Sequence, residues 1–318
     1  MDEIGVTFRQ ATISEISDSF IVAEKEAMSF DRLVFCAGSS MPFPAIKGAC
    51  EYGYSVDTYD QASRLDAHLD TLDMSCEADR TIVVVGASFT GIETVTKLRD
   101  RLDHRARLIL IDQAASPGAT LGENLSETIA MALSEADILL SMSKTIDHLQ
   151  RGVIALTDGS TLKSSTVIFT TGFVASPLTR SVSKEVAADG RICVEKSLRI
   201  PEAPTMFAAG DVAKAEADAG HPTLMSCQHA MPMGAVAGRN AVHDLAGCEL
   251  ESYTQPFYAT CLDLGPAGAV FTQGWERQIA KSGAEGAAMK AEINRKWIYP
   301  PDPSLGRDRI FSLITSGN

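Results

Sequence analysis

The chain has 318 residues, of which 45% are hydrophobic, and it carries a formal net charge of −13 at pH 7. This composition excludes a disordered protein and supplies enough apolar side chains for two domains. The negative charge argues against nucleic acid and against an anionic membrane surface as principal partners.

The cysteines and the hydropathy of the chain indicate in which cellular compartment the protein is found. The seven cysteines include no C-x-x-C pair, and isolated thiols without a redox-active disulfide are typical of a reducing environment. No stretch is long and apolar enough to span a bilayer, and the N-terminal residues form no basic, apolar leader. We therefore expect a cytoplasmic protein with at most peripheral contact at the inner face of the membrane.

The first functional signal in chain order lies in residues 31–48, DRLVFCAGSSMPFPAIKG. A short apolar strand ends here at Ala37-Gly38, and Pro42 and Pro44 stiffen the segment that follows. We interpret this segment as a connection that leads out of one domain and into the next.

Residues 81–93, TIVVVGASFTGIE, have the order of a dinucleotide-binding unit. The first five residues are all β-branched, which is typical of a strand buried in a parallel sheet. Gly86, Ser88 and Gly91 follow at the spacing of a phosphate-binding turn, and the apolar spacing after Gly91 predicts a helix. Free N–H groups at the start of such a helix bind pyrophosphate, so this unit predicts a dinucleotide site. The alternative is an α/β unit that binds no nucleotide.

Asp112 ends the next predicted strand, Arg107 to Ile111, about 20 residues after the turn. An acid at this place accepts hydrogen bonds from the adenosine ribose and repels a 2′-phosphate, so Asp112 favours NADH over NADPH. The alternative is an ordinary turn residue at a strand end.

Two further strand ends carry small residues. The strand Thr166 to Thr170 leads into Thr171-Gly172, which repeats the Ala37-Gly38 arrangement and predicts the return crossing between the domains. Residues 205–212, TMFAAGDV, form an apolar strand that ends in Gly210-Asp211. A carboxylate at the end of a buried strand needs a partner, either a ligand hydroxyl or a helix N-terminus. A helix is predicted next, with Pro232 in its first turn.

Taken together, LVFCAGS, VVVGASFTGIE, VIFTTGF and MFAAGDVA resemble, in order and spacing, the two-dinucleotide-domain flavoprotein reductases of the pyridine nucleotide-disulfide oxidoreductase superfamily. Within it the chain is most similar to the type II NADH dehydrogenases. The resemblance implies an α/β fold with Rossmann-like FAD- and NAD(P)-binding domains and a small C-terminal α+β piece. It also implies an FAD-dependent NADH:acceptor oxidoreductase, in which a hydride passes from NADH to flavin and electrons then pass to a quinone or a small electron carrier.

The resemblance assigns roles to residues of this chain. Gly86, Ser88 and Gly91 would hold the NADH pyrophosphate, and Asp112 would hold its ribose. Glu93, Gln228 and His229 are the candidate catalytic residues: Glu93 would help place the nicotinamide, and the other two would lie near the flavin ring and the acceptor. Asp211 would bind the ribityl chain of FAD. Three glycines in the turns at strand ends would also contact the cofactors: Gly38, Gly172 and Gly210.

The resemblance also divides the chain. We expect residues 1–75 to be the remainder of the first half of the FAD domain, 76–172 the inserted NADH domain, 173–254 the second half of the FAD domain, and 255–318 a C-terminal interface or acceptor region. The first glycine motif of the family is not visible, so we expect the FAD domain to be incomplete at its N-terminus. Quinone-reducing members of the family carry the motif Ala-Gln-x-Ala-x-Gln. This chain has CQHAMP at the corresponding residues 227–232, so Pro232 stands where the motif has its second Gln.

Several alternatives stay open. The chain could be an NADH-binding fragment or regulatory module that no longer holds flavin. His229 could donate a proton to an acceptor, as its pKa range allows, or it could be a capping or packing residue. The predicted partner is a small-molecule acceptor, and contact with a second copy of the chain, as in a homodimer, stays open. We predict no metal site.

Overall fold

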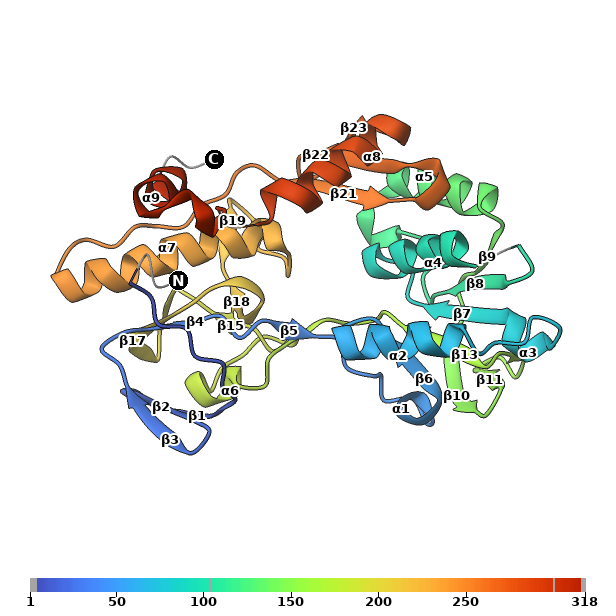
Figure 1. Ribbon diagram of the computed structural model, residues 1–318, viewed down its shortest axis with the longest axis horizontal. Coiled ribbons are helices and arrows are strands. Elements are labelled where there is room, and N and C mark those ends of the chain that lie inside the picture. Colours follow the sequence, from blue (N-terminus) through green and yellow to red (C-terminus); the bar gives the residue numbers. More distant parts are fainter. Residues whose placement is uncertain (1–4, 103, 300, 316–318) are drawn as a thin grey trace. The chain divides into compact units, whose positions relative to one another are not determined.

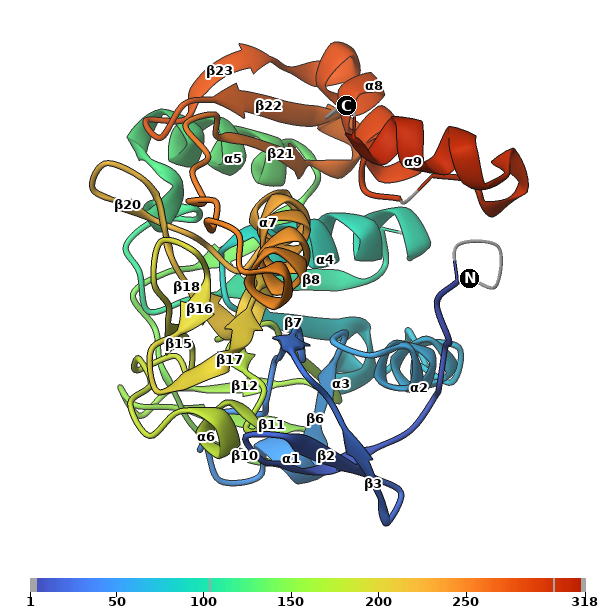
Figure 2. The same ribbon diagram turned by 90° about the vertical axis from the view of Figure 1, so that its left-hand side faces the viewer.

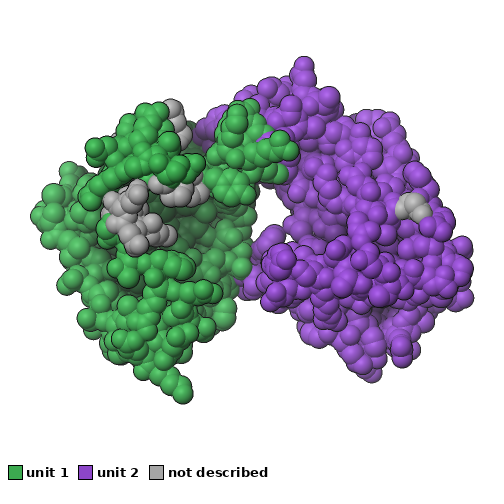
Figure 3. Space-filling view, in the orientation of Figure 1, with its two compact units in different colours: residues 1–39, 175–256, 292–318 green, residues 40–174, 257–291 purple. Residues whose placement is uncertain are grey.

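The structure is a computed structural model that describes residues 5–102, 104–299 and 301–315. The chain forms two compact units, each built from separate segments (Figure 3). Unit 1 consists of residues 1–39, 175–256 and 292–318, and unit 2 of residues 40–174 and 257–291. The chain passes between the units first at β5 (Ser39–Ser40) and β14 (Val174–Ala175), close to the small-residue turns identified in the sequence, and again after residues 256 and 291.

These boundaries differ from the domain boundaries expected from the sequence. Residues 40–75 lie in unit 2 with the predicted dinucleotide segment, and the C-terminal region divides after residue 291. The predicted α/β class is confirmed, because parallel strands alternate with helices in unit 2. Within the described residues, no helix combines the length and the apolar composition that a membrane crossing requires.

Unit 2 is built on a five-stranded sheet with the order β6-β13-β7-β8-β9 (Figure 1). All its neighbouring strands run parallel. The strands are β6 (Gly53–Ser55), β13 (Thr166–Phe169), β7 (Thr81–Val85), β8 (Arg107–Ile111) and β9 (Ile138–Ser141). The bounds of β7 and β8 are those predicted from the sequence.

Both faces of this sheet are covered, which explains the continuous apolar runs in its strands. On one face, Ile82 and Val84 pack in a cluster with α2 (Tyr59–Leu69), α4 (Phe89–Arg101) and α5 (Glu123–Glu135). On the other face, Val83 packs with α1 (Ala49–Tyr52) and with a small antiparallel sheet. That small sheet contains β10 (Ile146–Gln150), β11 (Val153–Leu156) and β12 (Thr161–Lys163), and its second hairpin turns at Asp158-Gly159. A short helix, α3 (Glu77–Arg80), precedes β7.

A second layer covers α4 and α5. It is a three-stranded antiparallel sheet of β21 (Ala259–Asp263), β22 (Ala269–Gln273) and β23 (Gln278–Lys281), followed by α8 (Gly283–Glu292). Figures 1 and 2 show this sheet beside α5. Leu262, Leu264 and Val270 join the same apolar cluster as α4 and α5. The segment 257–291 is therefore part of the core of unit 2.

Unit 1 is centred on a three-stranded sheet, β16-β17-β4, covered by the long helix α7 (Cys227–Ala246). Its strands are β16 (Arg199–Ile200), β17 (Ala203–Ala208) and β4 (Leu33–Phe35), and β4 runs parallel to β17 with Phe35 opposite Ala208. The remaining strands are short: β1 (Ile13–Ile16), β2 (Phe20–Ala23), β3 (Glu26–Ser29), β15 (Ile192–Cys193), β18 (Ala213–Lys214), β19 (Glu216–Asp218) and β20 (His221–Pro222). The other helices are α6 (Thr179–Val182) and α9 (Arg307–Thr315).

Pro232 corrects one prediction. The helix was expected to begin near Pro232, but α7 begins at Cys227, so the proline lies inside the helix. Proline has no N–H to donate to the carbonyl four residues earlier, which here belongs to Gln228. The side chain of Gln255 donates to that carbonyl at 3.1 Å. This substitute hydrogen bond explains how the helix can extend past the proline.

The buried Arg99 on α4 connects several elements of unit 2 through hydrogen bonds. Its side chain is 6% exposed and donates to the carbonyls of Ala106, Ala136 and Asp137 at 3.0–3.1 Å. These carbonyls follow α5 and precede β8, so Arg99 joins α4 to the two loops at that end of the sheet.

We predict that Arg99→Met lowers the free energy of unfolding by about 3 kcal/mol, because two buried carbonyls and one part-buried carbonyl lose a charged donor. Arg101→Met is the matched control in the same turn: its ion pairs with Asp66 and Asp70 are exposed and screened by solvent, so their loss should lower the free energy of unfolding much less. Urea denaturation measures both. Equal losses for the two variants would contradict the role assigned to Arg99.

Candidate functional site

The turn between β7 and α4 brings its two glycines into very close contact. Gly86 has φ +108°, a conformation that side chains disfavour. A Cβ at Gly91 would lie 1.7 Å from the carbonyl oxygen of Gly86, so only glycine fits there. The first turn of α4 is thereby held against the end of β7, as a phosphate-binding turn requires.

Ser88 occupies the position of the missing middle glycine without backbone strain. Its φ of −104° is open to any residue, and its side chain is exposed. Ser88 is the N-cap of α4, yet its hydroxyl caps no N–H group of the helix. The start of α4 therefore keeps its N–H groups and its positive dipole end available for an anion.

Thr170, at the end of β13, clamps this turn, and the sequence analysis did not identify it. Its hydroxyl donates to the carbonyl of Val85 at 2.8 Å and lies 3.3 Å from that of Gly86. The side chain is 7% exposed. Gly172 follows two residues later with φ +75° and is exposed beside the same end of the sheet.

Asp112 binds the turn from the opposite side, at the end of β8. One carboxylate oxygen accepts from the N–H of Ala87 at 2.6 Å, and the other accepts from the N–H of Ala114 at 2.7 Å. Each oxygen keeps a further lone pair. Asp112 is therefore more than a strand-end turn residue, because it fixes the glycine turn and still offers acceptors.

Glu93, on the second turn of α4, is held by an ion pair that the sequence analysis missed. Its Oε1 accepts from Lys290 Nζ at 2.7 Å and from the N–H of Asp263 at 2.9 Å. Lys290 also donates to the carbonyl of Cys261 at 2.8 Å. Because Lys290 lies far along the chain on α8, no local sequence pattern could have predicted this pair.

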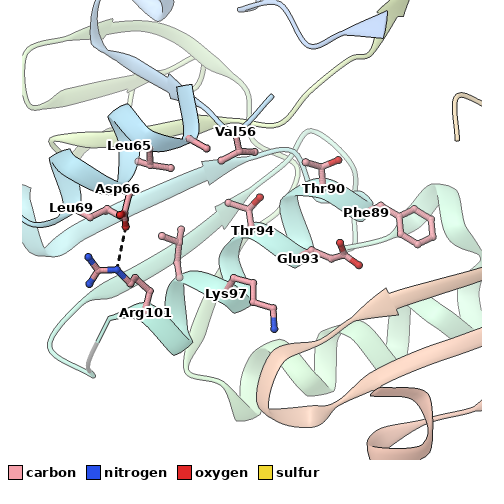
Figure 4. Close-up of a pocket in the computed structure, with 12 residues that line it drawn as sticks. Val56, Leu65, Asp66, Leu69, Phe89, Thr90, Glu93, Thr94, Lys97 and Arg101 are labelled. Carbon is pink, nitrogen blue, oxygen red and sulfur yellow. Dashed lines mark hydrogen bonds and ion pairs between the residues drawn. The ribbon is translucent and has the colours of Figure 1, made fainter. Parts of the chain in front are cut away.

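A groove of about 460 Å³ runs along α4 between that helix and α2 (Figure 4). Leu65 and Leu69 of α2 form part of its apolar floor, and Thr90 and Glu93 lie at the end nearest the glycine turn. The ion pair between Arg101 and Asp66 lies toward the other end. Within unit 2, Glu93 is therefore beside a recess as well as near the turn.

Unit 1 carries a second group of predicted residues at the ends of its parallel strands. Gly38 follows β4 with φ +70°, and Gly210 follows β17 with φ +73°. Ser39 donates from its hydroxyl to the carboxylate of Asp211 at 2.7 Å. The neighbouring strand ends thus bring Gly38, Gly210 and Asp211 together.

The start of α7 lies against this group. A Cβ at Gly210 would lie 3.4 Å from the Cβ of Ala230, in the first turn of the helix. The N-cap residue, Ser226, caps no N–H group of the helix, and its hydroxyl is buried with no hydrogen-bond partner among the described residues. Gln228 is half-buried in the same turn. These groups can receive a polar ligand beside Asp211.

His229 points into unit 1 and is fully buried at 0% exposure. Its Nδ1 lies 3.3 Å from Oε1 of Gln255 and 3.4 Å from the hydroxyl of Tyr253. Burial lowers the pKa of His229 and so favours its neutral form, and burial raises the pKa of Tyr253 to about 12. The structure therefore favours the packing role of His229 over direct proton donation to an acceptor.

No group of three or more His, Cys, Asp or Glu side chains among the described residues is arranged to hold a metal ion.

Comparison with known proteins identifies the family. The family model described as pyridine nucleotide-disulphide oxidoreductase matches residues 3–234. An NADH dehydrogenase-like protein of Mycobacterium tuberculosis is 41% identical over 285 residues, covering 86% of this chain and 71% of the relative. The demethylphylloquinone reductase of Synechocystis is 25% identical over 280 residues, covering 85% of this chain and 69% of the relative.

Among solved structures, that of NDH2 from Plasmodium falciparum in complex with NADH superimposes with a TM-score of 0.77 at 12% identity. The match covers 97% of this chain and 83% of the other, and it shows the shared fold. The predicted Rossmann-like fold, the flavoprotein oxidoreductase class and the cofactor pair of FAD and NADH are thus confirmed at the level of the family. The chain belongs to the pyridine nucleotide-disulphide oxidoreductase family.

Proposed function

We propose that the chain is an FAD-dependent NADH:acceptor oxidoreductase of the type II NADH dehydrogenase kind. The observation that carries the proposal is the glycine turn of unit 2. Thr170 and Asp112 hold it from both sides, and it ends at an uncapped helix start. This arrangement matches the needs of a dinucleotide pyrophosphate and its adjacent ribose.

In this proposal the NADH pyrophosphate binds to Gly86, Ser88 and Gly91 at the start of α4. The exposed hydroxyl of Ser88 can donate to a phosphate oxygen, which compensates for the missing glycine. Asp112 accepts from the ribose hydroxyls with the lone pairs that the backbone leaves free. A 2′-phosphate would meet its negative charge, so NADH is preferred over NADPH.

Glu93 would help to place the nicotinamide. Lys290 holds one of its oxygens at 2.7 Å, which fixes the rotamer and leaves the second oxygen for a ligand amide. Gly172 would let the backbone after β13 approach the same ligand. Lys290 acts through Glu93 and is therefore a positioning residue.

The residues of unit 1 fit one side of FAD. Asp211 would accept from the ribityl hydroxyls, Gly38 and Gly210 would allow close approach of the backbone, and the start of α7 would face the ring. The buried hydroxyl of Ser226 supports this assignment because it has no hydrogen-bond partner among the described residues. When bound, FAD would accept a hydride from NADH and pass the electrons to an acceptor.

A quinone is the proposed acceptor. Several curated relatives support it by name, including the demethylphylloquinone reductase and type II NADH:quinone oxidoreductases. Gln228, half-buried in the first turn of α7, is the residue proposed to meet the acceptor carbonyl. The buried His229 plays no direct part, and Pro232 removes the second amide that quinone-reducing members carry.

The acceptor is tested by mixing the chain with FAD, NADH and a short-chain naphthoquinone while NADH and quinone absorbance are followed together. Equal loss of NADH and quinone supports the proposal. NADH loss that leaves the quinone oxidised in the absence of oxygen would assign the electrons to a different acceptor.

We predict that Asp112→Asn weakens NADH binding about tenfold and narrows the preference over NADPH. The amide offers fewer hydrogen-bond acceptors to the ribose, and it carries no negative charge that would repel the 2′-phosphate of NADPH. Titration of both nucleotides gives the two affinities. Asp100→Asn, at the other end of α4, is the control and should bind as the parent does. An unchanged NADH-to-NADPH ratio in Asp112→Asn would remove Asp112 from the ribose site.

We predict that Lys290→Met slows reduction of bound flavin by NADH about tenfold, because Glu93 loses the partner that fixes it. NADH affinity should change little, since the phosphate turn is untouched. Stopped-flow absorbance separates the rate from the affinity. Lys97→Met is the control: this lysine lies on α4, as Glu93 does, and pairs with Asp263, but its side chain is more exposed than that of Lys290. A parental rate in Lys290→Met would show that the pair serves stability alone.

A further inference from the structure

Unit 2 has a second recess, polar in character and distinct from the dinucleotide turn. Its volume is about 350 Å³, within the range of small-ligand sites. Ser164 and Ser165 line it just before β13, and Asp79 lines it just before β7. It therefore lies at the amino ends of the parallel strands, whereas the glycine turn follows the carboxyl end of β7.

Two arginines line this recess, Arg64 from α2 and Arg151 from the turn between β10 and β11. Within the part of the chain that the structure describes, neither guanidinium forms a hydrogen bond or an ion pair with a protein group. Arg64 instead lies over the ring of Tyr54, 5.2 Å from its centroid. That ring stacks on His68 with a centroid distance of 4.5 Å. The stack restricts Arg64, so binding a ligand costs less conformational entropy.

Several other polar groups of the recess are already hydrogen-bonded within the protein. Asp79 accepts from the hydroxyl of Ser165 at 2.6 Å and from the N–H of Asp73 at 3.3 Å. His68 is hydrogen-bonded to Thr166 at 2.8 Å.

The two serines and the remaining acid follow the same pattern. The hydroxyl of Ser164 lies within hydrogen-bond distance of two strand carbonyls, that of Thr81 at 2.7 Å and that of Thr166 at 2.9 Å. Glu51 bonds the hydroxyl of Tyr52, which raises the pKa of Tyr52. The two guanidiniums therefore keep hydrogen-bond donors that no protein group uses. Such donors suit carboxylate or phosphate oxygens.

We propose that this recess, which we call the arginine recess, binds a small organic oxyanion, a phosphate- or carboxylate-bearing metabolite, between Arg64 and Arg151. The site is independent of the proposed hydride chemistry, because none of its residues contacts the glycine turn. It requires local cations, since the chain as a whole is strongly acidic. Arg64 and Arg151 supply them.

The test is isothermal titration calorimetry of the full chain with inorganic phosphate and, separately, with citrate, in a buffer free of other oxyanions. Saturating NADH is present throughout, which occupies the glycine turn. We expect saturable binding of at least one probe, with phosphate and citrate separating the two anion classes. Arg64→Gln and Arg151→Gln should each weaken it about tenfold, because each removes charged hydrogen bonds.

Arg107→Gln is the control, since Arg107 is an exposed arginine of the same sheet outside the recess. It should bind the probe as the parent does, and all three variants should keep parental NADH affinity, which shows that they fold. Absence of saturable binding in the millimolar range would overturn the proposal. So would binding that Arg64→Gln and Arg151→Gln leave unchanged, or that Arg107→Gln weakens equally.

Discussion

The contact between Gly91 and the carbonyl of Gly86 is the constraint on which the dinucleotide site depends. With room for no Cβ, the first turn of α4 lies directly against the end of β7. The neighbouring strands then hold the turn, β13 through the hydroxyl of Thr170 and β8 through the carboxylate of Asp112. Because the sheet places these strands on either side of β7, its order determines the shape of the phosphate site.

The same helix connects the site to the rest of unit 2. Its buried face packs in the main apolar cluster, Arg99 ties its last turn to two loops, and Glu93 joins it to α8 through Lys290. The sheet formed by residues 257–291 therefore supports the residue proposed to contact the nicotinamide. A segment distant in the sequence thus contributes to the site by positioning α4 and Glu93.

Local sequence patterns predicted those structural features that depend on residues close together in the chain. Strands β7 and β8 were predicted with the bounds observed, because continuous β-branched and apolar runs signal burial on both faces. The helix after Gly91 followed from the spacing of its apolar residues. The family resemblance correctly predicted the fold class and the oxidoreductase class.

Features that depend on tertiary contacts were missed. The start of α7 was placed too late because proline disfavours helix interiors, and only the structure shows that Gln255 replaces the hydrogen bond lost at Pro232. The pairing of Glu93 with Lys290 and the clamp by Thr170 join residues on different elements. The arginine recess likewise draws its arginines from α2 and from the β10–β11 turn, so no single motif marks it.

The central claim is that one chain brings NADH and flavin into reaction, and the visible spectrum tests it most directly. The chain is purified, incubated with FAD, freed of excess cofactor and recorded before and after anaerobic NADH. We predict a retained flavin spectrum that bleaches on NADH addition. A colourless protein that binds NADH but retains no FAD would contradict the account and indicate a dinucleotide-binding module without flavin.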